Sequence, residues 1–221
     1  VLSSEEARAI VKDNPDSFLR VNKSEVDFPP NTPPYGEEIY KKGRENLERL
    51  MNEGLMARDD KPFFYLYRLS WRGRSQTGLV ALTSVEEYDK GLIKKHEHTR
   101  PAKVNDRANH IMTLQAQVGP VFTTFRQNPE IKSLFTRLSS RAPKVSFTSP
   151  DGVTHELWVV DDEVTIKAIV AAFGKLGEMY IADGHHRYGI SRTYRDAQKS
   201  RIAQEIAPGD LAQAKLFLQF G

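Results

Sequence analysis

The sequence predicts an α+β fold, in which a mixed or antiparallel sheet built from hairpins is flanked by helices. Two hairpins are indicated: the aromatic run 63–69 returns as 78–82 after the turn residues 72–75, and strands 145–148 and 154–160 flank Pro150-Asp151-Gly152. Amphipathic segments accompany the hairpins, such as 37–55, whose apolar residues repeat at helical spacing. Hairpins mixed with helices favour α+β over strict βαβ alternation.

The N-terminal elements follow from capping residues and prolines. Ser3-Ser4-Glu5-Glu6 supplies a hydroxyl cap and first-turn carboxylates, so a helix is expected from there to Asn14-Pro15, where proline disfavours helix. Phe18-Leu19-Arg20-Val21 alternates in polarity and predicts a short strand. The segment 26–35 contains four prolines and predicts a loop, after which the helix 37–55 begins.

The remaining elements follow from similar signals. Residues 83–87 form a capping pattern that opens a short helix. Further helices are predicted over 106–117, 128–139, 164–173 and 188–203, the last with few apolar positions, and further strands over 120–125 and 178–182.

Composition excludes several classes of function. The 32 Lys and Arg exceed the 29 Asp and Glu by only three, and no basic run of five or six residues occurs, so neither nucleic acid nor a membrane is the expected partner. The absence of cysteine excludes disulfides, zinc–thiolate sites and thiol nucleophiles. No apolar run approaches the roughly 18 residues of a membrane span. We therefore expect a cytoplasmic globular protein.

The ends of the chain and its length bear on its organisation. The chain starts at Val1 without Met and ends in the apolar stretch 217–221, so we expect it to be part of a longer protein. Its 221 residues suit one α+β domain, which could subdivide into 1–125 and 126–221. The free edges of aromatic hairpins are compatible with a homodimer.

A first cluster of functional residue types is Asp183-Gly184-His185-His186-Arg187-Tyr188, between a predicted strand and a predicted helix. Such a junction exposes backbone N–H groups and the positive end of a helix dipole, which suits an anion. Gly184 permits close approach of a ligand, and Arg187 can bind a phosphate or carboxylate through two parallel hydrogen bonds. Asp183 could hold Mg²⁺ or orient a histidine. The plainer alternative is a capped turn with surface histidines.

A second cluster is Lys94-Lys95-His96-Glu97-His98-Thr99-Arg100, followed by Asn105-Asp106-Arg107. In an extended segment His96 and His98 would share one face and Glu97 would lie on the other. The pair of histidines could chelate a metal, whereas a histidine and a glutamate in one loop could transfer protons. The basic residues nearby would attract an anionic substrate. A solvated loop without such a role is the alternative.

At these clusters the sequence resembles a bacterial family of uncharacterised proteins, domain of unknown function family 1015. The resemblance runs from end to end and rests on the blocks Leu2–Arg8, Asn14–Val21, His96–Glu97 with Thr99 and Asp106–Arg107, and Tyr180–Tyr188. Members of that family are about twice this length, which implies a longer protein.

The block Asp183–Arg187 is also similar, more loosely, to the phosphate-binding motif of the ParB–sulfiredoxin superfamily. That resemblance implies a nucleotide-binding core around a strand–loop–helix unit. The superfamily includes partition proteins that bind CTP, sulfiredoxin, and a kinase of free serine. Sulfiredoxin chemistry needs a cysteine that this chain lacks, and no basic stripe or helix-turn-helix supports DNA binding. Of the activities that this resemblance implies, the interpretation as a protein similar to the serine kinase remains.

Three hypotheses follow. In the first, the protein is a phosphotransferase or phosphohydrolase that uses ATP or ADP with Mg²⁺ and acts on a small metabolite. The second is a regulatory module that binds a nucleotide without turnover, and the third is a metal-dependent hydrolase using His96, His98, His185 and His186. For the first hypothesis the expected catalytic residues are His96, Glu97, Asp183 and His185, the phosphate-binding residues are Gly184, His186 and Arg187, and the substrate-binding residues are Thr99, Arg100, Asp106 and Arg107.

Overall fold

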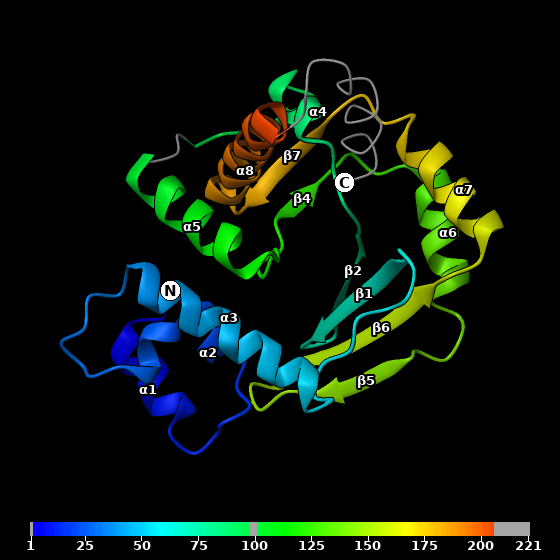
Figure 1. Ribbon diagram of the computed structural model, residues 1–221. Helices are drawn as coiled ribbons and strands as arrows, with labels where there is room; N and C mark the ends of the chain where they lie inside the picture. The colour runs from blue at the N-terminus through cyan, green and yellow to red at the C-terminus, as the bar shows by residue number, and fades with distance from the viewer. Residues whose placement is uncertain (1, 98–100, 206–221) are drawn as a thin grey trace. The chain divides into compact units, whose positions relative to one another are not determined.

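The computed structural model describes residues 2–97 and 101–205, without the side chains of 101–103 and 200–205. These residues form an α+β protein with eight α-helices, one short 3₁₀ helix and seven strands (Figure 1). The predicted fold class is therefore confirmed. The chain packs as two compact units, each assembled from separated segments. The described parts of Val1–Ala57, His96–Phe122 and Asp183–Gly221 form the helical unit, and Arg58–Lys95 with Thr123–Ala182 forms the hairpin unit. Whether the chain counts as one domain stays a prediction.

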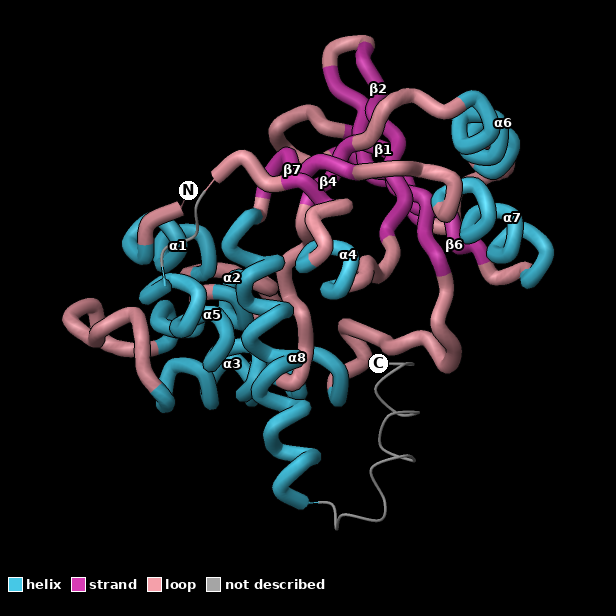
Figure 2. Tube along the Cα trace, turned by 90° about the horizontal axis from the view of Figure 1, so that it is seen from above, coloured by secondary structure: helices cyan, strands magenta, loops and turns pink. Residues whose placement is uncertain are grey.

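The helical unit is built around α5, which contacts both α3 and α8 (Figure 2). One apolar cluster joins Val21, Leu47, Leu50 and Leu114, and a second joins Val104, Ala108 and Ile190. Different residues of α5 therefore pack against α3 and against α8. The helices of this unit are α1 (Ser4–Val11), α2 (Leu19–Asn22), the 3₁₀ helix η1 (Ser24–Asp27), α3 (Glu37–Asn52), α5 (Pro101–Leu114) and α8 (His185–Glu205).

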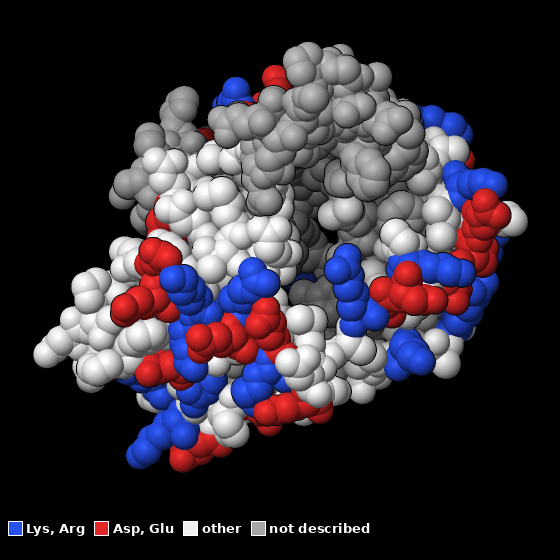
Figure 3. Space-filling model, viewed as in Figure 1, with Lys and Arg blue, Asp and Glu red and all other residues white. Residues whose placement is uncertain are grey.

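The predicted caps and most predicted helices of this unit are confirmed. The Ser3 side chain accepts from the Glu6 amide while the Glu6 carboxylate accepts from the Ser3 amide, a complete capping box. On α3, pairs such as Glu37–Lys41 and Arg44–Glu48 alternate in sign along the exposed side. Figure 3 shows Lys and Arg intermixed with Asp and Glu on the face that it displays.

The predicted strand over 18–21 is wrong, because Leu19–Asn22 forms the short helix α2. A helical turn places Phe18 and Val21 on one side, and Val21 is fully buried against Leu47 and Leu50 with Phe18 packed beside it. Four residues of alternating polarity cannot distinguish a strand from a helical turn. Burial of Val21 therefore favours the helical turn over a strand.

The hairpin unit contains a four-stranded antiparallel sheet with the order β2-β1-β6-β5. Its strands are β1 (Phe64–Trp71), β2 (Arg74–Val80), β5 (Val145–Thr148) and β6 (Thr154–Val160). Both predicted hairpins are confirmed. Trp71 pairs with Arg74, so Arg72 and Gly73 form a two-residue turn, and both have positive φ, 48° and 74°. That pattern matches a tight turn of type I′.

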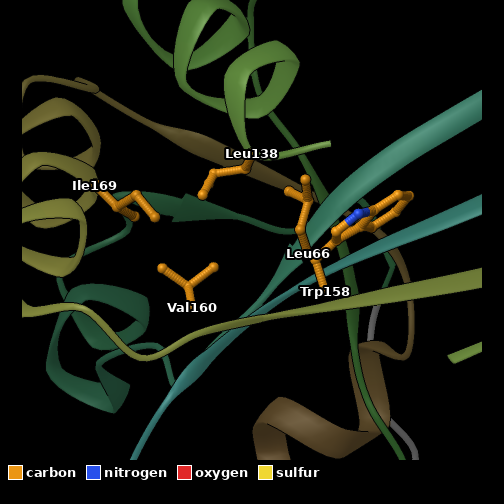
Figure 4. Packing of buried hydrophobic residues seen from close by; sticks show 5 residues of the cluster. All are labelled: Leu66, Leu138, Trp158, Val160 and Ile169. Atoms are coloured by element: carbon orange, nitrogen blue, oxygen red, sulfur yellow. The ribbon is translucent and has the colours of Figure 1, made fainter. Parts of the chain in front are cut away.

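Two helices, α6 (Pro129–Leu138) and α7 (Glu163–Phe173), cover one face of this sheet. Leu138 of α6 and Ile169 of α7 pack on Leu66, Trp158 and Val160 of the strands, as Figure 4 shows. Alternate residues of β1 reach this core, as expected for a strand with one face covered.

Among the remaining elements, α4, β4 and β7 lie close to their predicted positions, whereas the short strand β3 was not predicted. The helix α4 (Val85–Asp89) has Ser84 as its cap, and a three-stranded sheet has the order β3-β7-β4. Its strands are β3 (Ile93–Lys94), β4 (Phe122–Thr124) and β7 (Met179–Asp183), with β3 parallel to β7. No helix among the described residues is long and apolar enough to cross a membrane.

Candidate functional site

The first cluster lies where β7 passes into α8 through the single residue Gly184. The helix begins at His185, three residues before its predicted start, so His185, His186 and Arg187 occupy its first turn. Gly184 has φ of +93°, a conformation that side chains disfavour, and a Cβ there would lie 3.4 Å from Val121. The sharp turn therefore depends on glycine and places the N-terminus of α8, the positive end of its dipole, directly after β7.

The two clusters meet at His185, which is only 4% exposed. Its ring lies edge-on to the His96 ring, with 4.3 Å between centroids. Its Nδ1 is 3.6 Å from Glu97 Oε2, and the His96 backbone N–H donates to its Nε2 over 3.4 Å. Although these partners lie about ninety positions earlier in the chain, all three residues belong to the helical unit.

The surroundings of His185 lower the pKa of its imidazole and so favour the neutral form. Burial is the largest influence on it and lowers the pKa of its imidazole, and the neighbouring His96 lowers it further. The carboxylates of Glu97 and Asp183 act in the opposite direction without reversing the shift. A neutral ring that accepts at Nε2 carries its proton on Nδ1, on the side of Glu97.

The groups around this buried ring are accessible. His96, Glu97 and Asp183 are exposed, and the Glu97 side chain retains 60% of its accessible surface. In an extended segment His96 and Glu97 would point to opposite faces, yet both contact His185, because the chain bends at Glu97. The arrangement offers an exposed carboxylate and an exposed imidazole beside a helix N-terminus.

Arg187 is held by a turn that the sequence analysis did not single out. Its Nη1 donates to the Pro120 carbonyl oxygen. A Cβ on Gly119 would come within 3.0 Å of its Nε, so this glycine makes room for the guanidinium. A guanidinium has five N–H donors, and the Pro120 contact commits one of them. The signal in the sequence was the Gly119-Pro120 dipeptide, a turn marker.

Asp106 and Arg107 have other partners. The Tyr40 hydroxyl of α3 donates to Asp106, and the Arg107 guanidinium donates to the Asn22 carbonyl oxygen over 3.4 Å. Burial, followed by Asp106, raises the pKa of Tyr40 to about 12. Since Val104 and Ala108 form the side of α5 packed on α8, Asp106 lies on the side toward α3.

The structure thus brings together some of the predicted site residues and separates others. His96 and Glu97 meet the Asp183–Arg187 segment, whereas Asp106 and Arg107 serve the packing of α5 against its other neighbours. Thr99 and Arg100, with His98 of the metal hypothesis, lie outside the described residues. Within residues 2–97 and 101–205, no group of three or more His, Asp or Glu side chains could hold a metal ion.

The fold and the site together define an α+β protein in which Gly184 links the strand β7 to the long helix α8, whose first residue is the buried His185. The family profile described as "Protein of unknown function (DUF1015)" matches residues 1–218, and the chain belongs to this family. Searches of curated proteins and of solved structures found no match.

Proposed function

We propose that the junction between β7 and α8 binds the phosphate groups of ATP or ADP, and that the protein transfers a phosphoryl group to a hydroxyl of a small metabolite. The observation that carries the proposal is the meeting of His96 and Glu97 with His185 at the N-terminus of α8. A phosphate site and a candidate proton acceptor then lie side by side. The looser similarity to the ParB–sulfiredoxin superfamily, with its free-serine kinase, favours an amino-acid hydroxyl as acceptor.

Phosphate binding would use groups of the first turn of α8. Gly184 has no side chain to obstruct an anion, and the helix dipole attracts one. Arg187 and His186 supply donors from side chains, and Arg187 is already fixed by its Pro120 contact. Asp183 would hold Mg²⁺, which supplies neutralisation of the phosphate charge.

Glu97 would accept the proton of the substrate hydroxyl. The acceptor hydroxyl oxygen bonds to the terminal phosphorus, the bond from that phosphorus to the departing nucleotide's oxygen breaks, and the Glu97 carboxylate takes the hydroxyl proton. Glu97 is exposed enough to meet a substrate and lies beside the neutral His185. His185 would act as a positioning residue, because its Nε2 already accepts from the His96 amide. His96 is the second candidate base.

Thermal unfolding with ATP, ADP, CTP and pyrophosphate, with and without Mg²⁺, tests phosphate binding. A ligand at a hundred times its dissociation constant adds about 2.7 kcal/mol, which raises the midpoint by roughly 5–10 °C in a protein of this size. We expect Arg187→Lys to reduce the shift, and the matched variant Arg44→Lys on the exposed side of α3 to retain it. A chain that shows no shift with any nucleotide would refute the proposal.

Turnover is tested separately, by following nucleotide consumption with serine and other hydroxyl metabolites as acceptors. Glu97→Gln should keep the nucleotide-induced shift and lose about 10²–10⁴-fold in rate, the usual contribution of a general base. The matched variant Glu45→Gln on α3 should keep both. Binding that persists without turnover would instead support a regulatory nucleotide-binding module.

A further inference from the structure

A second site is indicated in the hairpin unit, by a groove between the sheet and α6. Its volume is about 310 Å³, at the lower end of the range for small-molecule sites. Arg68 of β1 lies on one wall and Lys132 of α6 on the other. None of the residues that line this groove belongs to the junction of β7 with α8.

The floor of the groove is apolar. Phe125, Ile131 and Phe135 line it, and both phenylalanines contact Phe173, with 5.3 Å and 6.3 Å between ring centroids. Ile131 is buried, whereas the two phenylalanine rings are half-buried. A flat apolar group could therefore lie on a floor whose shape neighbouring aromatic rings maintain.

The polar groups of the groove suit an anion. None of the described residues that line the groove is acidic, and Arg68 and Lys132 are both cationic. Asn128 uses its Oδ1 to accept from the amides of Glu130 and Ile131, so the group that it can offer a ligand is its NH₂ donor. Two cationic groups and the Asn128 amide donor therefore lie beside the apolar residues of the groove.

Arg68 is held in place before any ligand arrives. Its Nε donates to Thr77 Oγ1 over 3.0 Å, and its guanidinium lies 4.9 Å from the centre of the Trp158 ring. Glu156 forms an ion pair with Arg68 at 3.7 Å, and because both side chains are partly exposed, water screens part of that attraction. Little side-chain entropy remains for a ligand to remove.

We propose that this groove binds a small organic anion, with its apolar body on Phe125, Ile131 and Phe135 and its charge between Arg68 and Lys132. The site is independent of the phosphate site in the helical unit. Ligand-observed NMR titration tests it with 1-naphthoate as the anion and 1-naphthylmethanol as a neutral molecule of the same shape.

The variants separate this groove from other cationic surfaces. Lys132→Met should weaken naphthoate binding by about tenfold, as expected for one lost charge-assisted hydrogen bond, and leave naphthylmethanol unaffected. Lys175→Met is the matched control, because Lys175 pairs with Glu130 and does not line the groove. Thr136→Trp, an exposed position on α6, should fill the groove and abolish binding.

Four results would overturn the proposal. Naphthoate could fail to bind saturably, it could bind no better than the alcohol, or Lys132→Met could behave like Lys175→Met. Loss of binding in Arg187→Lys would likewise overturn it, because the naphthoate would then occupy the phosphate site. Retained binding in Arg187→Lys, together with loss in Thr136→Trp, would establish the groove.

Discussion

The two units bury different kinds of side chain. Among the described residues, five of the six buried polar side chains lie in the helical unit and one, Thr165, lies in the hairpin unit. The five are Ser24, Glu25, Asn46, His110 and His185. The hairpin unit instead centres on the apolar cluster around Leu66 and Trp158. Buried polar groups cost free energy unless they are satisfied, and they concentrate where chemistry or precise positioning is needed.

The partners of these buried groups explain how the helical unit tolerates them. Asn46 donates to both the Arg20 carbonyl oxygen and the Asp27 carboxylate, each over 2.8 Å, and His110 contacts the Val21 carbonyl oxygen over 3.1 Å. This unit is thus held by specific hydrogen bonds as well as by apolar burial. The hairpin unit is expected to respond to lost volume, and the helical unit to lost partners and to protonation.

The largest effect is expected from Leu66→Ala in the hairpin unit. Leu66 is fully buried, with 0% accessible surface. Truncation therefore leaves a cavity and should cost about 2–5 kcal/mol of unfolding free energy. Urea denaturation measures the loss. A cost below about 1 kcal/mol would mean that the cluster is loosely packed.

A smaller loss is expected from Asn46→Ala in the helical unit. The variant removes the buried Asn46 amide, which donates to two half-buried acceptors, and should cost about 1–3 kcal/mol. The same denaturation experiment compares it directly with Leu66→Ala. An unchanged midpoint would show that water replaces the amide and would weaken the contrast between the units.

Gly184→Ala probes the turn before α8. Its φ of +93° disfavours a side chain, and we expect a cost of about 1–2 kcal/mol. Gly177→Ala is the matched control, because a Cβ there meets nothing within 4 Å and its φ is not positive. Equal midpoints for the two variants would contradict the argument from backbone conformation.

The smallest effect is a pH dependence that arises in the helical unit. Burial is the first cause that lowers the pKa of both His110 and His185, so the unfolded chain takes up protons at a higher pH than the folded one. Their contribution to stability is complete above the unfolded histidine pKa near 6.5 and is lost as pH falls from there toward the folded values, at no more than about 1.4 kcal/mol per pH unit for each group.

Replacement of both histidines should flatten this dependence. The variant His110→Gln with His185→Gln is compared with Asn46→Ala, which removes a buried amide that does not titrate and should lower stability about equally between pH 7 and pH 5. Thermal midpoints between pH 7 and pH 5 give the slopes. A double variant with the wild-type slope would assign the pH dependence to other groups.

The two hairpins of the hairpin unit could be predicted closely because the contacts within each hairpin are local, whereas the pairing of β1 with β6 joins segments about ninety positions apart. The turn at Arg72-Gly73 and the turn at 150–152 each join strands that pair with each other, so turn chemistry and alternation in the sequence suffice. Trp71 illustrates a limit of that reasoning. It is 48% exposed at the hairpin end, under the Arg72 guanidinium, whereas Trp158 is buried. Local pattern does not indicate which aromatic residue a helix will cover.

The helical unit could be predicted less completely. Capping residues marked the start of α1, but the polarity of residues 18–21 indicated a strand where burial of Val21 produces a helical turn. The grouping of Asp106 with the site also followed from proximity in sequence. Its place on the side of α5 toward α3 depends on which side of that helix packs on α8.

The sequence by itself determined the α+β class, both hairpins, most helices and the residue types at the junction of β7 with α8. These features depend on backbone preferences and periodicity, which act over a few residues. Only the tertiary structure decided that His96 and Glu97 meet His185, and that Arg187 lies against Gly119 and Pro120. Those contacts join segments far apart in the chain, and packing of α5 against α8 is what closes the distance.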